Sequence, residues 1–131
     1  MLKPIARLVV VAAVVMVAVP AYSSEVVQMW RCELDDATTE QEVLDDAQAW
    51  LDAARKLPGG ERMEAHVFFP VVVNATGEMD LMLVVKSPSF EEWGKFWDAY
   101  GGSEAAALEV QHQEQVVCPN SVLWEAFKLD Q

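Results

Sequence analysis

After residue 24 the chain alternates between strand-like and helix-like patterns, and the order of these patterns leaves few folds open. Four segments are rich in β-branched and aromatic residues and predict strands; they are 26–34, 63–73, 79–86 and 121–129. Three segments repeat apolar residues at spacings of three and four and predict helices, the last less regularly; they are 39–57, 89–100 and 103–114. With the last two helical segments counted as one helical connection, the order is β-α-β-β-α-β. This order predicts a ferredoxin-like α+β fold, in which a four-stranded antiparallel sheet carries helices on one face.

Local signals mark the ends of these elements. Two capping boxes begin the first two helices; they are Thr39 with Glu42 and Ser89 with Glu92. Turn-forming residues at 58–60 end the first helix, and those at 74–78 join the second and third strands into a hairpin. A further break is expected at 119–120, before the last strand. Pro70 cannot donate to a strand ladder, so the second strand is expected at an edge of the sheet.

Residues 1–23 have the pattern of a cleavable export signal. Positive charges at Lys3 and Arg7 precede an unbroken apolar run of twelve residues, 8–19, and small residues follow it. The two candidate cleavage sites lie after Ala21 and after Ser23. An uncleaved membrane anchor is the alternative, but a spanning helix needs about 20 apolar residues, more than this run supplies.

Cleavage at either site leaves one domain, residues 24–131, which is expected in the periplasm or as a secreted protein. The whole chain has a formal net charge of −12, and loss of the two basic residues of the signal would make it −14. This charge excludes nucleic acid and anionic membrane surfaces as partners, because both select basic proteins. The acidity either serves solubility or selects a cationic partner.

Cys32 and Cys118 are the two cysteines of the chain. An even number of cysteines in an exported protein predicts a disulfide. Two free thiols or a redox pair are the alternatives, although the chain has no Cys-x-x-Cys motif. In the usual order of the ferredoxin-like sheet, the first and fourth strands are antiparallel neighbours. That order brings the end of the first strand, with Cys32, close to Cys118 before the fourth.

The face of the sheet opposite the helices is also expected to be covered. A sheet with one face in water alternates between apolar and polar residues. The third strand instead has Leu83 and Val85 on one face and Met82 and Val84 on the other. We therefore expect a partner subunit or an enclosed ligand on this open face.

These features resemble the dimeric α+β barrel superfamily. The resemblance is carried by the order of the elements, the strands that are apolar on both faces, and the aromatic helix entered through the segment 87–93. The resemblance covers nearly all of the mature chain. In its pair of cysteines, the chain is most similar to uncharacterised exported bacterial members of the superfamily. The resemblance implies a homodimer whose sheets face each other across a pocket. Enzymes of the superfamily mostly use an Asn, Trp and His or Arg set, whereas the first strand here offers Gln28 and Arg31 but no asparagine.

Four strand residues are predicted to form a binding surface on the open face; they are Arg31, His66, Met82 and Trp124. Arg31 alternates with Cys32, and so it faces away from the helices if Cys32 contacts them. It either binds an anion or pairs with Glu33 or Glu125. His66 is either a ligand or acid–base group, because histidine titrates near neutral pH, or a packing residue.

Other candidate residues are interpreted as structural. An aromatic face on the second helix is read as core, with pocket lining as the alternative; it comprises Phe90, Trp93, Phe96, Trp97 and Tyr100. His112 is expected on a helix surface, in solvent. The chain has no Gly-rich phosphate loop, His-Glu-x-x-His motif or serine nucleophile elbow, and its carboxylates are scattered. No catalytic residue, cofactor or metal site is therefore assigned.

Three functions follow as hypotheses. The first is an exported, non-enzymatic homodimer that binds a small apolar or amphipathic ligand. The second is an enzyme of the dimeric α+β barrel type, either a cofactor-free or a haem-active monooxygenase-like protein. The third is a periplasmic module whose open face binds another protein.

Overall fold

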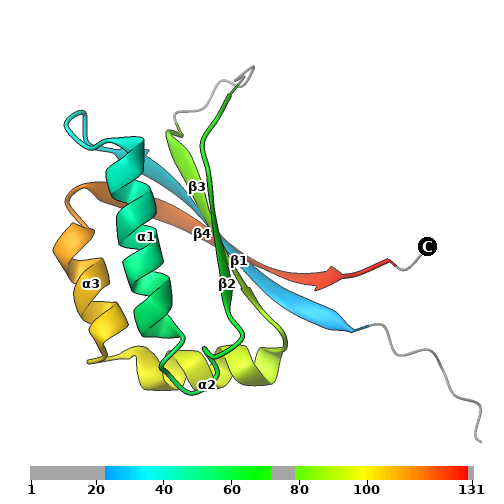
Figure 1. Ribbon diagram of the computed structural model, residues 1–131. Helices are drawn as coiled ribbons and strands as arrows, with labels where there is room; N and C mark the ends of the chain where they lie inside the picture. The colour runs from blue at the N-terminus through cyan, green and yellow to red at the C-terminus, as the bar shows by residue number, and fades with distance from the viewer. Residues whose placement is uncertain (1–22, 72–78, 130–131) are drawn as a thin grey trace, which may run out of the picture.

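A computed structural model describes residues 23–71 and 79–129 of the protein (Figure 1). Almost all of the predicted export signal and the predicted turn at 74–78 lie outside these residues. The elements in chain order are β1 (Ser24–Leu34), α1 (Glu40–Ala54), β2 (Glu64–Phe68), β3 (Leu81–Ser87), α2 (Phe90–Tyr100), α3 (Glu104–His112) and β4 (Val116–Phe127).

The strands form one antiparallel sheet in the order β2-β3-β1-β4. The helices lie on one side of this sheet (Figure 1). The placement of β4 beside β1 and the edge position of β2 are as expected, so the predicted ferredoxin-like α+β fold is confirmed.

Two strand predictions were wrong at their ends. β2 stops at Phe68, well before the predicted end at residue 73, because Pro70 cannot continue the ladder. β4 begins at Val116 and runs through the predicted break at 119–120. Pro119 is accommodated there because β4 is an edge strand, and because the β1–β4 register shifts between Arg31 and Glu33.

The helix starts follow the predicted capping, with one exception. In α1, the Thr39 side chain accepts from the Glu42 amide at 3.3 Å, and the Thr39 amide donates to Glu42 Oε2 at 2.8 Å. In α2, the Ser89 side chain accepts a hydrogen bond from the Glu92 amide at 3.2 Å, but the Glu92 carboxylate does not accept one from the Ser89 amide. It binds Arg62 instead, so the second predicted capping box is only half formed.

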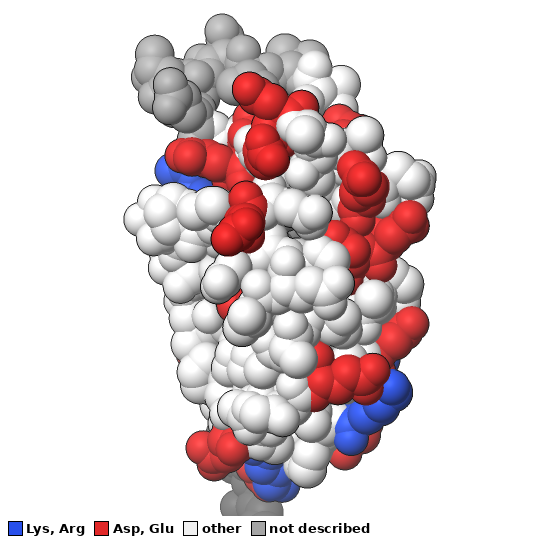
Figure 2. All heavy atoms as spheres, turned by 90° about the vertical axis from the view of Figure 1, so that its left-hand side faces the viewer, with Lys and Arg blue, Asp and Glu red and all other residues white. Residues whose placement is uncertain are grey.

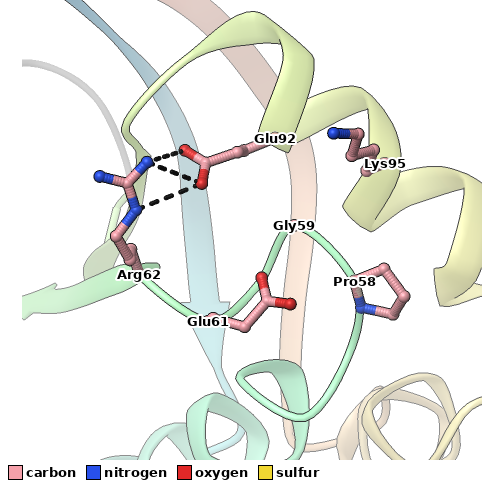
Figure 3. A pocket seen from close by; sticks show the side chains of 6 residues that line it. All are labelled: Pro58, Gly59, Glu61, Arg62, Glu92 and Lys95. Carbon is pink, nitrogen blue, oxygen red and sulfur yellow. Dashed lines mark hydrogen bonds and ion pairs between the residues drawn. The ribbon is translucent and has the colours of Figure 1, made fainter.

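The loop after α1 packs tightly against α2 (Figure 3). Arg62 Nη2 lies 2.8 and 2.9 Å from the two carboxylate oxygens of Glu92. Gly59 has φ +81°, and a Cβ at this position would lie 2.1 Å from the backbone oxygen of Glu92. Only glycine fits such a position. The hollow at this junction is bridged by the protein's own ion pair, and we interpret it as a structural contact.

The core lies between the sheet and the helices, with Phe96, Met63 and Leu81 among its fully buried side chains. The predicted disulfide between Cys32 and Cys118 is present, with the two Cα atoms 4.1 Å apart. Cys32 is buried, and the bridge ties β1 to β4 beside α1. Because an 86-residue separation is closed by this bond, the first and last strands are held together covalently.

Candidate functional site

A cavity of about 530 Å³ lies between the helices and the sheet. Paired residues in an antiparallel ladder share a face, and Trp30 pairs with Leu83 as Gln28 pairs with Val85. Trp30 packs against the buried core beneath the helices, so these four residues form the floor. The helices supply the walls and roof; their lining residues are Val43, Asp46, Ala47, Trp50, Trp97, Tyr100, Leu108, Glu109 and His112.

Aromatic rings dominate the walls of the cavity. Trp97 and Tyr100 are three residues apart in α2 and so lie on one face of that helix. Their ring centroids are 4.7 Å apart, and the Trp50 ring from α1 lies 6.4 Å from Tyr100. Phe96 is fully buried behind them. The aromatic face of the second helix therefore contributes both to the core, through Phe96, and to the cavity lining, through Trp97 and Tyr100. Each of the two interpretations of the sequence holds for part of this face.

A chain of hydrogen bonds links the three helices at Tyr100. The Trp50 indole Nε1 donates to the Tyr100 hydroxyl at 3.0 Å, and that hydroxyl donates to the Glu109 carboxylate. Burial raises the pKa of Tyr100 above its usual range, and the hydrogen bond to Glu109 raises this pKa further. Tyr100 is therefore a neutral donor that holds the Glu109 carboxylate at the cavity.

A second polar link joins α3 to α1. His112 Nδ1 lies 2.9 Å from Asp46 Oδ2 and 3.0 Å from Gln115 Oε1. The expectation that His112 lies in solvent was wrong, because α3 extends to this residue and turns it toward α1. His112 is three residues after Glu109 and Trp50 is four after Asp46, so each pair shares a helix face. That spacing is visible in the sequence, but the pairing of the two faces is not.

The four predicted binding residues all lie in strands of the sheet, facing away from the helices. Arg31 pairs with Met82, His66 with Val84, and Trp124 with Val27, and the Cys32 side of β1 contacts α1. The ring of His66 stacks near Phe68, with centroids 6.2 Å apart. Of the four, His66 alone is among the residues that line the cavity. Their binding role stays a prediction.

The predicted ion pair of Arg31 does not form within the described residues. Glu125 pairs with Val26, which faces the helices, so it lies on the opposite side of the sheet from Arg31. Arg31 is instead exposed.

The open face is largely apolar. Its exposed apolar side chains include Phe68 at 49%, Val122 at 49% and Trp124 at 56% of their full accessibility. In the middle of the same face, Val27 and Val84 are already buried by their neighbours. The two-sided apolarity expected of the strands is thus present in the fold.

Within residues 23–71 and 79–129 no group of three or more His, Cys, Asp or Glu side chains is arranged to hold a metal ion. The helices there are too short or too polar to cross a membrane.

Comparison with known proteins identifies the fold. No protein-family model and no curated protein sequence matches this chain. The Arabidopsis thaliana protein At3g17210 superimposes with a TM-score of 0.54 and 8% identity, over 82% of this chain and 97% of that one. A dimeric ferredoxin-like protein of unknown function from Thermobifida fusca YX gives 0.46 and 13%, over 81% and 92%. A mutant chlorite dismutase from Candidatus Nitrospira defluvii gives 0.44 and 8%, over 83% and 42%.

At such low identities the similarity concerns the fold alone, and the two lower scores add nothing to it. The superposition on At3g17210 agrees with the strand order and helix placement described above. The protein therefore has the ferredoxin-like fold that the sequence pattern predicted.

Proposed function

We propose that the protein is an exported, non-enzymatic binding protein that holds a small, largely apolar ligand between its helices and its sheet. The observation that carries this proposal is the cavity of about 530 Å³. Pockets for small molecules are typically about 300–1,000 Å³, with mostly apolar and aromatic walls and a few polar groups that orient the ligand. Trp30, Trp50 and Trp97 supply such walls, and Gln28 and Glu109 supply polar groups.

Filling the cavity tests this function. Ala47 lines the cavity, whereas Ala49 of the same helix is exposed, so Ala47→Phe and Ala49→Phe form a matched pair. The neutral dye N-phenylnaphthylamine is titrated into each protein and its fluorescence is measured. We expect saturable binding that Ala47→Phe weakens about tenfold or more, equivalent to about 1.4 kcal/mol, and that Ala49→Phe leaves unchanged.

Two outcomes would contradict the proposal. One is wild-type protein that shows no saturable binding and carries no small molecule in native mass spectra after purification from its own host. The other is equal binding by both variants. Circular dichroism tests whether Ala47→Phe is folded, and Leu108→Trp serves as a second filling variant on α3.

The open face supports the proposal of a homodimer. Contiguous exposed apolar surface in a sheet favours burial against a partner. The start of β1 and the end of β4 also run beyond the helices as a two-stranded ribbon (Figure 1). This ribbon exposes Trp124 on the open face, and Leu123 and Phe127 on the opposite face, where they pair with Gln28 and Ser24. A second copy that packs on the open face would cover Trp124 together with Phe68 and Val122.

Sedimentation tests the dimer. Val122 on the open face and Val110 on the surface of α3 are both exposed valines, so Val122→Glu and Val110→Glu introduce the same charge in two places. We expect a dimer that Val122→Glu dissociates and Val110→Glu does not. A wild-type monomer would refute it, and a monomer that co-purifies with a different periplasmic protein would favour an interaction module.

Export is supported by the Cys32–Cys118 disulfide, since such bonds persist mainly in oxidising compartments. The intact mass of protein from the periplasm or medium should correspond to cleavage after Ala21 or after Ser23. Full-length chain recovered only from the cytoplasm would contradict export.

An enzyme is the alternative, and the His112–Asp46 pair at the cavity favours it. A carboxylate beside an imidazole orients it for proton transfer, as a cofactor-free or haem-active monooxygenase-like enzyme would require. Haem titration distinguishes the haem-active form. A Soret shift that is lost in His112→Ala and retained in His66→Ala would favour the enzyme over the binding protein.

A further inference from the structure

We propose that the ligand of this cavity is an organic cation, with an apolar body against the aromatic walls and a positive group beside Glu109 and Asp46. This inference rests on the binding function proposed above and adds the charge of the ligand to it.

The charges that line the cavity are of one sign. Glu109 and Asp46 are its carboxylates, and no lysine or arginine is among the described residues that line it. Its histidines are His66, whose ring stacks near that of Phe68 on the same strand, and His112, which faces Asp46. On the outer face that carries α1 and α3, the charged side chains are mainly acidic, and the basic ones lie at its margins (Figure 2). An anionic ligand would meet repulsion on approach and again inside the cavity.

The aromatic walls add a second attraction of the same kind. The faces of tryptophan and tyrosine rings carry negative potential and attract ammonium groups within about 6 Å of the ring centre. Trp50, Trp97 and Tyr100 stand around one region of the cavity, with Tyr100 4.7 Å from Trp97. The hydroxyl of Tyr100 donates a hydrogen bond to the Glu109 carboxylate, so this carboxylate lies at the edge of the group of rings. Rings and carboxylate together form a site for a partly desolvated positive charge.

The competing interpretation is that these polar contacts only fasten α1, α2 and α3 together. In that case the cavity would bind by shape and apolar area alone, and the charge of a probe of fixed shape would have no effect on its affinity.

Isosteric probes distinguish these interpretations. Phenyltrimethylammonium and tert-butylbenzene have the same shape and differ in charge, and benzenesulfonate carries the opposite charge. Each is titrated against N-phenylnaphthylamine bound to the wild-type protein, and displacement of the dye is measured. We expect the cation to bind about tenfold or more tightly than the neutral isostere, and benzenesulfonate to bind least.

Two glutamate variants locate the effect. Glu109→Gln keeps an acceptor for Tyr100 but removes the charge, while Glu114→Gln removes the same charge just beyond α3, outside the cavity lining. We expect Glu109→Gln to abolish most of the preference for the cation and Glu114→Gln to retain it. The wild-type protein gives an independent measure, because added salt should weaken binding of the cation and not of the neutral probe.

The failures of the two proposals are separable. Equal displacement by the cation and its neutral isostere, or a preference unchanged in Glu109→Gln, overturns the inference of a cationic ligand and leaves the binding function standing. Absence of displacement by every probe, together with no saturable binding of the dye, overturns both.

Discussion

Removal of the Cys32–Cys118 disulfide should cost a large part of the stability of the domain. The bond joins residues separated by 86 positions, and the reduced unfolded chain gains the freedom that this closure withholds. The chain-entropy relation gives about 4.6 kcal/mol at 25 °C for a loop of this length. A domain of this size is stable by about 5–15 kcal/mol, so the loss would bring the protein close to its unfolding threshold.

Equilibrium unfolding in urea measures this loss. The double variant Cys32→Ala with Cys118→Ala is compared with the oxidised wild type, by far-ultraviolet circular dichroism. With a urea dependence of about 2 kcal/mol per molar, the midpoint should fall by roughly 2 M. Wild-type protein treated with reductant serves as the second comparison and should fall by a similar amount.

A change smaller than about 1 kcal/mol would refute this reasoning. It would mean either that the bridge is absent in the folded protein or that the unfolded chain keeps β1 and β4 together without it. Intact mass before and after reduction separates these outcomes, because reduction of one disulfide adds two protons.

Three further outcomes follow from local geometry, each measured by equilibrium unfolding. Gly59→Ala should destabilise the domain by about 2 kcal/mol or more, because residue 59 has a positive φ and lies against α2. Gly94→Ala should stabilise the domain by about 0.5–1 kcal/mol, because Gly94 lies inside a helix with open space around it. Equal effects of the two substitutions would contradict the packing of the loop on α2. Thr39→Ala should cost about 1 kcal/mol as the N-cap of α1 is lost, and no change would contradict the capping box. The raised pKa of Tyr100 means that the unfolded chain loses a proton near pH 10 while the folded protein keeps it, so stability is present below that pH and falls as the pH rises above it. Tyr100→Phe should reduce the slope of stability with pH above about 10, and an unchanged slope would contradict the buried hydroxyl.

The order of the elements could be predicted because its signals are local. Thr39 and Glu42 form their cap within one turn, and β1 has its apolar pattern within eleven residues. The ends of the strands were harder to predict from the sequence. Pro119 reads as a break in isolation, and only the bulge opposite Arg31 and the edge position of β4 allow the strand to pass through it.

The candidate site was harder to predict than the fold, because its residues come from separate elements. Asp46 and His112 lie in two helices whose contact is set by packing on the sheet, and neither helix alone predicts the pair. The position of the Glu92 carboxylate was equally hard to predict. It binds Arg62, which comes from the loop after α1, instead of completing the capping box of α2. The open-face residues could be assigned to one face from the sequence because strand alternation is a local property, and their binding role stays a prediction.

The free edges of the sheet also bear on how copies of this protein meet. An edge strand offers unpaired backbone groups to other chains, and short strands, prolines and bulges are the usual protections. β2 has five residues with Pro70 close behind it, and β4 carries Pro119 beside its bulge. Strand-to-strand stacking into open-ended aggregates is thereby disfavoured at both edges. The protein can therefore expose an apolar sheet face for association, while its protected sheet edges disfavour assembly into fibres.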